Sequence, residues 1–222
     1  MSTMPQSLAL TMPVGSRGTA VACRGLDIVV AGLLLLLLLP ALLIVAVAIR
    51  IESPGHVLFR QRRLGRGLEA FTMNKFRTMR TGTGDTAHRS HVLGLIGHDQ
   101  GGRRPMTKLE EDSRITRVGR FLRRTSLDEV PQLINVLRGE MSLVGPRPPI
   151  QYEVDHYPVA AFQRFAVMPG ITGLWQVSGR SQLSFTEMIA LDAEYVRRRS
   201  FWLNLSILLR TPLVVLRGHG AA

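Results

Sequence analysis

Two adjacent carboxylates, Asp128 and Glu129, stand shortly after a pair of arginines at positions 123 and 124. Guanidinium groups bind phosphate oxygens, while a carboxylate can bind a divalent cation or attack a phosphorus atom. The cationic surroundings keep Asp128 ionised and therefore nucleophilic, and Glu129 is suited to hold Mg²⁺. The pattern predicts phosphate chemistry with a divalent metal, in which Asp128 and Glu129 are the catalytic and metal-binding residues.

The same pair fits the start of a helix. Pro131 is accepted only near a first helical turn and Gly139 is a typical stop, so a helix is predicted from near 126–128 to 138. Acids at a helix start also satisfy free amides, and Glu129 has capping-box spacing to Ser126. A cap needs only one acid, and the neighbouring arginines favour phosphate chemistry over capping alone.

Further candidates for phosphate binding lie in three other segments. Arg147 stands between two prolines, whose fixed backbone angles hold its guanidinium in place for a phosphate. Lys75 and Arg77 are two residues apart in a predicted strand, so both point to one face. Trp175 and Arg180 are suited to stack on a base and to bind a diphosphate. The alternatives are a surface arginine in a stiff turn, an exposed edge strand and a core tryptophan.

The elements that carry these residues predict a mixed fold. Apolar spacing and capping signals favour helices, and an Arg/Gly turn between apolar runs favours a hairpin. The predicted strands are 56–59 and 68–76, and the further predicted helices are 114–124, 151–165, 186–199 and 203–216. Residues 168–180 are predicted to be loop and strand. A Gly-, His- and Arg-rich stretch, 81–105, is predicted to be a long mobile loop.

An apolar segment near the N-terminus predicts a membrane element. Residues 28–49 carry no charge, and such a run is long enough to cross a bilayer as a helix. A cleaved signal peptide is one alternative, but the run is much longer than the usual core of such a peptide. Pro40 breaks the run at its middle, and arginines flank both ends, which favours cytoplasmic placement of both. A kinked spanning helix and a helix broken at Leu39–Pro40 that re-enters the same face fit these features equally well.

The composition limits the partners. The 222 residues carry a formal net charge of +12, and residues 60–124 contribute +10 of it. Such a region attracts nucleic acid, anionic lipid or phosphorylated small molecules. No recognised nucleic-acid module is present, which argues against a membrane-tethered nucleic-acid-binding protein. A non-catalytic membrane scaffold would not need the Asp-Glu pair. The single cysteine, Cys23, excludes an internal disulfide framework.

Four segments together resemble the bacterial sugar transferases, the small monotopic phosphoglycosyl transferases. They are 75–79, 125–132, 135–148 and 169–180, and the resemblance covers about 24–217. It implies an α+β fold: an N-terminal re-entrant membrane helix, a small and mostly helical globular domain with short strands, and interfacial amphipathic helices. The expected division is a disordered leader at 1–20, the membrane helix at 21–52 and the catalytic domain at 53–222.

The resemblance also implies an activity. Such an enzyme moves a sugar-1-phosphate from a UDP-sugar to polyprenyl phosphate and releases UMP, as the first membrane step of exopolysaccharide assembly. The version of the 175–180 segment found here is typical of exopolysaccharide-initiating members, which favours a hexose. The expected location is the cytoplasmic face of the bacterial inner membrane, with membrane lipid as a partner and no nucleic acid. The sugar, the lipid chain length and the oligomeric state, including a homodimer, stay open.

The resemblance assigns roles residue by residue. Asp128 matches the nucleophile that forms a covalent phosphosugar intermediate, and Glu129 matches the acid that supports Mg²⁺. The matches to arginines that contact phosphate or nucleotide are Arg123, Arg147 and Arg180. Lys75 and Arg77 fall in the Lys-Phe-Arg segment, with a less defined role in substrate binding. Asn204 stands where relatives usually carry Asp, so any contribution of that position to phosphate binding is altered here.

Overall fold

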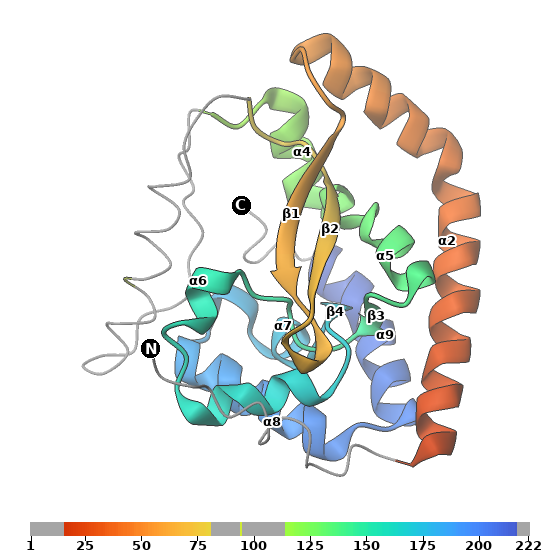
Figure 1. The fold of residues 1–222 in the computed structure, drawn as a ribbon. Coiled ribbons are helices and arrows are strands. Elements are labelled where there is room, and N and C mark those ends of the chain that lie inside the picture. Colours follow the sequence, from red (N-terminus) through yellow and green to blue (C-terminus); the bar gives the residue numbers. More distant parts are fainter. Residues whose placement is uncertain (1–15, 81–93, 95–113, 217–222) are drawn as a thin grey trace.

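The computed structural model describes residues 16–80, 94 and 114–216, and Figure 1 shows their arrangement. The α-helices are α2 (Arg17–Glu52), α4 (Arg117–Thr125), α5 (Gln132–Arg138), α6 (Gln151–Val154), α7 (Leu174–Ser178), α8 (Phe185–Arg198) and α9 (Phe201–Leu216). The strands are β1 (Leu58–Leu64), β2 (Ala70–Phe76), β3 (Ser142–Val144) and β4 (Gly170–Thr172). The 3-10 segments include the single turn η2 (Leu127–Glu129) and the longer η3 (Val159–Ala166). The mixed fold with a long apolar helix and small sheets is confirmed. The predicted leader up to residue 15 and the predicted loop 81–105, apart from Gly94, lie outside the described residues.

The apolar segment forms one continuous helix, α2. It begins at Arg17, four residues before the predicted boundary, where the Ser16 hydroxyl accepts the Thr19 N–H at 3.2 Å. Pro40 lies inside the helix without ending it, so the predicted break at Leu39–Pro40 is not confirmed. The axis instead curves as it passes over the globular part (Figure 1). The helix is long and apolar enough to cross a membrane, and most of its apolar side chains are exposed.

Both ends of α2 are attached to the globular part. Near the start, the Arg24 guanidinium donates to two carbonyls at the end of α5, at 2.6 and 3.0 Å. One turn later the Asp27 carboxylate accepts the Leu143 N–H at 2.9 Å and the Ser142 hydroxyl at 3.1 Å. At the other end, Glu52 accepts the first two backbone N–H groups of α4, at 2.6 and 2.8 Å. The helix is therefore fixed to β3, α5 and α4 at points 25 residues apart.

A hairpin and helix α5 form the support for the Asp-Glu segment. Strands β1 and β2 pair antiparallel over seven residues, so β1 is longer than the predicted 56–59. Buried Asn135 of α5 accepts the Asn74 N–H and side-chain amide, both at 3.0 Å, and donates to the Thr72 carbonyl at 2.7 Å. These bonds satisfy backbone N–H and C=O groups on the edge of β2 that faces away from β1, and they fix α5 to the hairpin.

The core joins elements that are far apart in sequence. Buried apolar side chains from α2, β2, α5, β3, α8 and α9 form its main cluster. Helices α8 and α9 confirm the helices predicted at 186–199 and 203–216. On α9, Trp202, Leu209, Leu213 and Leu216 remain exposed, and the predicted interfacial position of this helix stays a prediction.

Candidate active site

The Asp-Glu pair lies in a 3-10 turn, not in the first turn of the following helix. Turn η2 spans Leu127–Glu129, and α5 starts only after Pro131. Ser126 is left-handed (φ 56°) and makes no side-chain cap, so the predicted capping box and helix start are wrong. The reason is local. The Ser126 N–H donates to carbonyls in the last turn of α4 and so ends that helix. Pro131 has no N–H, so it cannot donate a helical hydrogen bond back to the Leu127 carbonyl. The carboxylates are thus presented on a short turn between two helices.

Lys75 reaches this turn from β2. Its ammonium lies 2.8 Å from Glu129 Oε1, and both side chains are partly exposed. Arg77, predicted to share a face with Lys75, is buried instead and donates to the carbonyls of Ser53 and of Pro54, the latter at 3.0 Å. Arg77 therefore fixes the chain that leaves α2, and its guanidinium contacts backbone rather than the carboxylate pair.

Arg123 approaches the same region from the last turn of α4. Its Nε donates to the Thr78 hydroxyl at 3.1 Å, which orients the guanidinium beside the end of β2. Thr78 and Lys75 belong to one short segment of the chain, so that segment contacts both Arg123 and Glu129. The structure thus gathers Lys75, Arg123 and the Asp-Glu turn around the end of β2.

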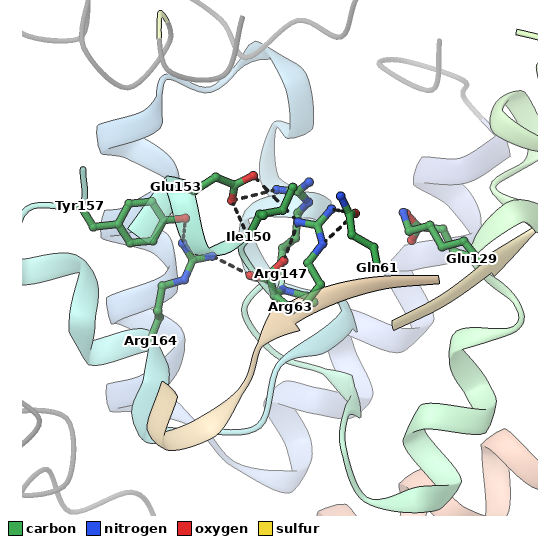
Figure 2. Close-up of polar contacts among 10 residues, drawn as sticks. Gln61, Arg63, Glu129, Arg147, Ile150, Glu153, Tyr157 and Arg164 are labelled. Atoms are coloured by element: carbon green, nitrogen blue, oxygen red, sulfur yellow. Dashed lines mark hydrogen bonds and ion pairs between the residues drawn. The ribbon is translucent and has the colours of Figure 1, made fainter. Parts of the chain in front are cut away.

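Arg147 belongs to a second group of charged residues further along the hairpin. Its guanidinium lies 3.8 Å from the buried Glu153 carboxylate, which is also 3.9 Å from the Arg63 guanidinium. Figure 2 shows Glu129 apart from this group, with Gln61 between them in that view. Sequence reasoning missed Arg63 and Glu153. Gln61 and Arg63 are two residues apart in a strand, so their side chains share a face, and this spacing could have identified Arg63 as part of the group.

The hairpin register relates the two groups. Lys75 pairs with Phe59, so Gln61 and Arg63 lie two and four residues further along the same face. Four residues of strand cover about 13 Å. One face of the hairpin therefore leads from the carboxylate pair to the group around Arg147, a path that suits an extended anionic ligand.

The remaining candidates are placed differently. Trp175 lies in α7, an element not predicted from sequence, and packs against a core cluster that contains Phe185. Arg180 follows α7 in a left-handed conformation (φ 49°). Asn204 is fully buried and its Oδ1 accepts the Tyr195 hydroxyl at 2.9 Å. Trp175 is therefore partly buried against the core, and Asn204 contacts phosphate only if the structure opens.

The Asp-Glu pair offers two carboxylates to a magnesium ion, the metal expected from the sequence. Within 16–80, 94 and 114–216, no group of three or more His, Cys, Asp or Glu side chains could hold a metal ion. Mg²⁺ usually binds one or two carboxylates together with substrate phosphates and water, so it does not need such a group. Adjacent, partly exposed Asp128 and Glu129 supply that smaller donor set.

The comparison with known proteins identifies the family. Residues 18–218 match the family model described as bacterial sugar transferase. This chain belongs to the bacterial sugar transferase family. The family resemblance of the four sequence segments is thereby confirmed, and the protein is an enzyme of the phosphoglycosyl transferase type. Together with the long apolar helix α2, the family indicates association with a membrane.

Several curated relatives are similar over most of this chain. The exopolysaccharide production protein ExoY of Rhizobium meliloti (strain 1021) is 35% identical, over 98% of this chain and 94% of its own length. The UDP-glucose:undecaprenyl-phosphate glucose-1-phosphate transferase of Caulobacter vibrioides is 42% identical, over 93% and 76%. The undecaprenyl-phosphate galactose phosphotransferase of Salmonella typhimurium is 38% identical, over 89% of this chain but 41% of its own length. This chain therefore corresponds to nearly all of the first relative and to less than half of the last.

Proposed function

We propose that this sugar transferase moves a hexose-1-phosphate from a UDP-sugar to polyprenyl phosphate, as the membrane step that begins exopolysaccharide assembly. The observation that carries the proposal is the Asp128–Glu129 turn, with Lys75 of β2 and Arg123 of α4 beside it. It lies at one end of a hairpin face that leads to Arg147. The named activities of the Caulobacter and Salmonella relatives support the same donor and acceptor classes.

The reaction proceeds in two displacements at one phosphorus atom. An Asp128 oxygen attacks the phosphorus that carries the sugar, and the bond from that phosphorus to the UMP oxygen breaks. UMP leaves with that oxygen, and the sugar-1-phosphate is left as an acyl phosphate on Asp128. An oxygen of polyprenyl phosphate then attacks the same phosphorus, which releases the carboxylate and forms a polyprenyl diphosphate sugar.

The cationic side chains bind and orient the phosphates. Arg123 and Arg147 are placed to contact phosphate oxygens at the two ends of the hairpin face. Lys75 holds Glu129, which fixes the acid beside the nucleophile. A magnesium ion held by Asp128, Glu129 and the donor diphosphate would neutralise phosphate charge.

Release of UMP tests the proposal directly. The purified protein is incubated with polyprenyl phosphate, Mg²⁺ and a panel of UDP-sugars, and UMP is measured for each. We expect UMP from UDP-glucose or UDP-galactose. Without polyprenyl phosphate, release should stop after about one UMP per protein, whereas with it release should continue over many turnovers. A protein that binds nucleic acid or lipid but releases no UMP from any UDP-sugar would be a tether or scaffold instead.

Removal of magnesium is expected to lower turnover by about 100-fold or more, because the diphosphate charge then opposes attack by a carboxylate. Steady-state UMP release is measured in excess chelator at constant ionic strength, then after Mg²⁺ is restored. Glu129→Gln should raise the Mg²⁺ concentration needed for half-maximal rate, whereas the matched change Glu194→Gln on α8 should not. Unchanged turnover in chelator contradicts a magnesium requirement.

The attachment of α2 supports a monotopic position in the membrane. Asp27 and Glu52 both bind the same globular part, although 25 helical residues, about 38 Å, separate them. A helix crossing a hydrocarbon core of about 30 Å would place one of these residues on the far side. The helix therefore enters and leaves the cytoplasmic leaflet of the inner membrane, and the curvature of α2 takes the place of a complete break (Figure 1).

Cysteine labelling is expected to find both ends of α2 on the cytoplasmic side. Single cysteines replace exposed Ser16 and exposed His56 in a Cys23→Ser background. An impermeant thiol reagent should label neither site in intact cells and both after permeabilisation. Labelling at the Ser16 position in intact cells would show that α2 spans the bilayer.

A further inference from the structure

The turn that carries Arg147 is held by three donors on three consecutive carbonyls. The Arg147 carbonyl accepts from Arg164 Nη2, the Pro148 carbonyl from Arg63 Nη1 and the Pro149 carbonyl from the Leu64 N–H, each at 3.0 Å. Prolines have no N–H, so this turn can be fixed through few groups other than its carbonyls. Two of the three donors are guanidinium groups of buried arginines.

Arg164 is itself held by two further partners. Its Nη2 lies 2.8 Å from Asp192 Oδ2, and its Nη1 donates to the Tyr157 hydroxyl at 3.0 Å. Figure 2 shows the guanidinium between Tyr157 and the Arg147 turn. The side chains of Arg164 and Asp192 are 3% and 2% exposed, so neither can touch the substrates. One planar guanidinium thus joins η3 to α8, to Tyr157 and to the backbone of Arg147.

The charges of this group do not balance. It holds three guanidinium groups, on Arg63, Arg147 and Arg164, and two carboxylates, on Glu153 and Asp192. Burial, and then the charge of Arg147, lower the pKa of Arg63 to about 10, at which it is still protonated near neutral pH. Burial raises the pKa of Asp192 to about 6 despite the opposing effect of Arg164, so it is mostly ionised at pH 7.

The excess positive charge can be compensated at only one member of the group. The Arg147 side chain is 36% exposed, whereas the side chains of the other four are at most 5% exposed. A phosphate that binds Arg147 from the solvent side therefore supplies the missing negative charge. Its binding depends on where the turn holds the Arg147 guanidinium, because bidentate contacts require accurate placement.

We propose that Arg164, held by Asp192 and Tyr157, is a positioning residue that fixes the Arg147 turn so that the Arg147 guanidinium meets a phosphate of the nucleotide donor. The role rests on the proposed function, since it assigns the anion to a UDP-sugar. Arg164 acts through the backbone carbonyl of Arg147 and does not itself contact the substrate.

A double-mutant cycle tests this role. Arg164→Lys keeps a positive charge, but an ammonium cannot reproduce the planar contacts to three separate partners. We expect it to lower kcat/KM for the UDP-sugar by about tenfold or more, with a matching loss in affinity for the probe UDP. In an Arg147→Ala background the same change should lower kcat/KM by no more than about threefold, because the residue that it positions is gone. Equal losses in both backgrounds would mean that Arg164 serves only general folding, and the proposal would be wrong.

Two further variants complete the experiment. Arg198→Lys, on an exposed residue of α8 paired with Glu194, is the matched control and should change neither kcat/KM nor UDP affinity. If Arg164→Lys does not fold, Tyr157→Phe removes only the hydroxyl bonded to Arg164 and is tested in the same two backgrounds. It should weaken UDP binding about two- to fivefold, and only where Arg147 is present. An equal effect of Tyr157→Phe in both backgrounds overturns the proposal.

The readouts separate this role from the proposed function. UMP release by the unmodified protein depends on the function alone, and its absence with every UDP-sugar would refute the function itself. Normal UMP release together with unchanged kcat/KM and UDP affinity in Arg164→Lys would refute only the positioning role.

Discussion

Asp128→Asn is expected to reduce UMP release by about three orders of magnitude or more. An amide keeps the shape of the side chain but has neither the charge nor the nucleophilicity to form an acyl phosphate. The position should tolerate the change structurally, because Asp128 lies partly exposed in a 3-10 turn rather than in the core. Turnover of each UDP-sugar by the variant is compared with that of the unmodified protein.

The covalent step can be observed without turnover. With a UDP-sugar and Mg²⁺ but no polyprenyl phosphate, intact-mass spectrometry should detect one hexose-phosphate adduct on the unmodified protein and none on Asp128→Asn. Asp155→Asn removes an exposed carboxylate at the end of α6 and should retain both the adduct and turnover. Near-normal turnover by Asp128→Asn would show that Asp128 is not the nucleophile.

Local patterns predicted much of the fold. The hairpin followed from its Arg/Gly turn, and the end of α5 followed from Gly139, which is left-handed at φ 80°. Helix α8, predicted from residue 186, begins one residue earlier, after a capping box between Ser184 and Glu187, which lie three positions apart. Each of these features depends on neighbours in the sequence, so one chain is sufficient to find it.

The failures have two origins. The Asp-Glu pair matched a helix start by spacing, but the left-handed Ser126 ends α4 and Pro131 delays the start of α5, and both causes are local. Other failures arose where distant contacts decide the structure. Arg77 lies two residues after Lys75, so strand alternation predicted that both side chains share a face. The Arg77 guanidinium instead donates to two backbone carbonyls that follow α2, 23 and 24 residues earlier in the chain. Helix α7 was missed because glycines surround it. Their role in packing is not visible in the sequence.

The candidate site shows the same division. Asp128, Glu129 and Arg147 were selected as candidates because a pair of acids and an arginine between prolines are local patterns. Arg164 lies 17 residues from the carbonyl that it binds and 28 residues from Asp192, so no short motif contains the group. A buried arginine and a buried aspartate each resemble ordinary surface charges until their burial is known.

Glycines 145, 170 and 173 allow two segments of the family pattern to touch through their backbones. Strands β3 and β4 pair in parallel, with Ser142 opposite Gly170, and the Gly170 N–H continues to the Pro146 carbonyl at 2.9 Å. A Cβ atom on Gly170 would lie 2.1 Å from the Gly145 nitrogen and 2.6 Å from the Thr172 oxygen. These are main-chain atoms, so no side-chain rotation relieves the overlap.

Gly170→Ala is therefore expected to destabilise the protein by about 3 kcal/mol, because the two chains must separate to admit one methyl group. For a protein of this size, that corresponds to a fall in melting temperature of about 6–12 °C, measured on protein in lipid nanodiscs. The matched control is Gly25→Ala in α2, where an added Cβ meets nothing within 4 Å and helix propensity improves. Because β3 leads directly into the Arg147 turn, separation of the strands should also lower the UDP affinity of the Gly170→Ala variant. A melting temperature equal to that of Gly25→Ala would show that the β3–β4 contact is not as close as described.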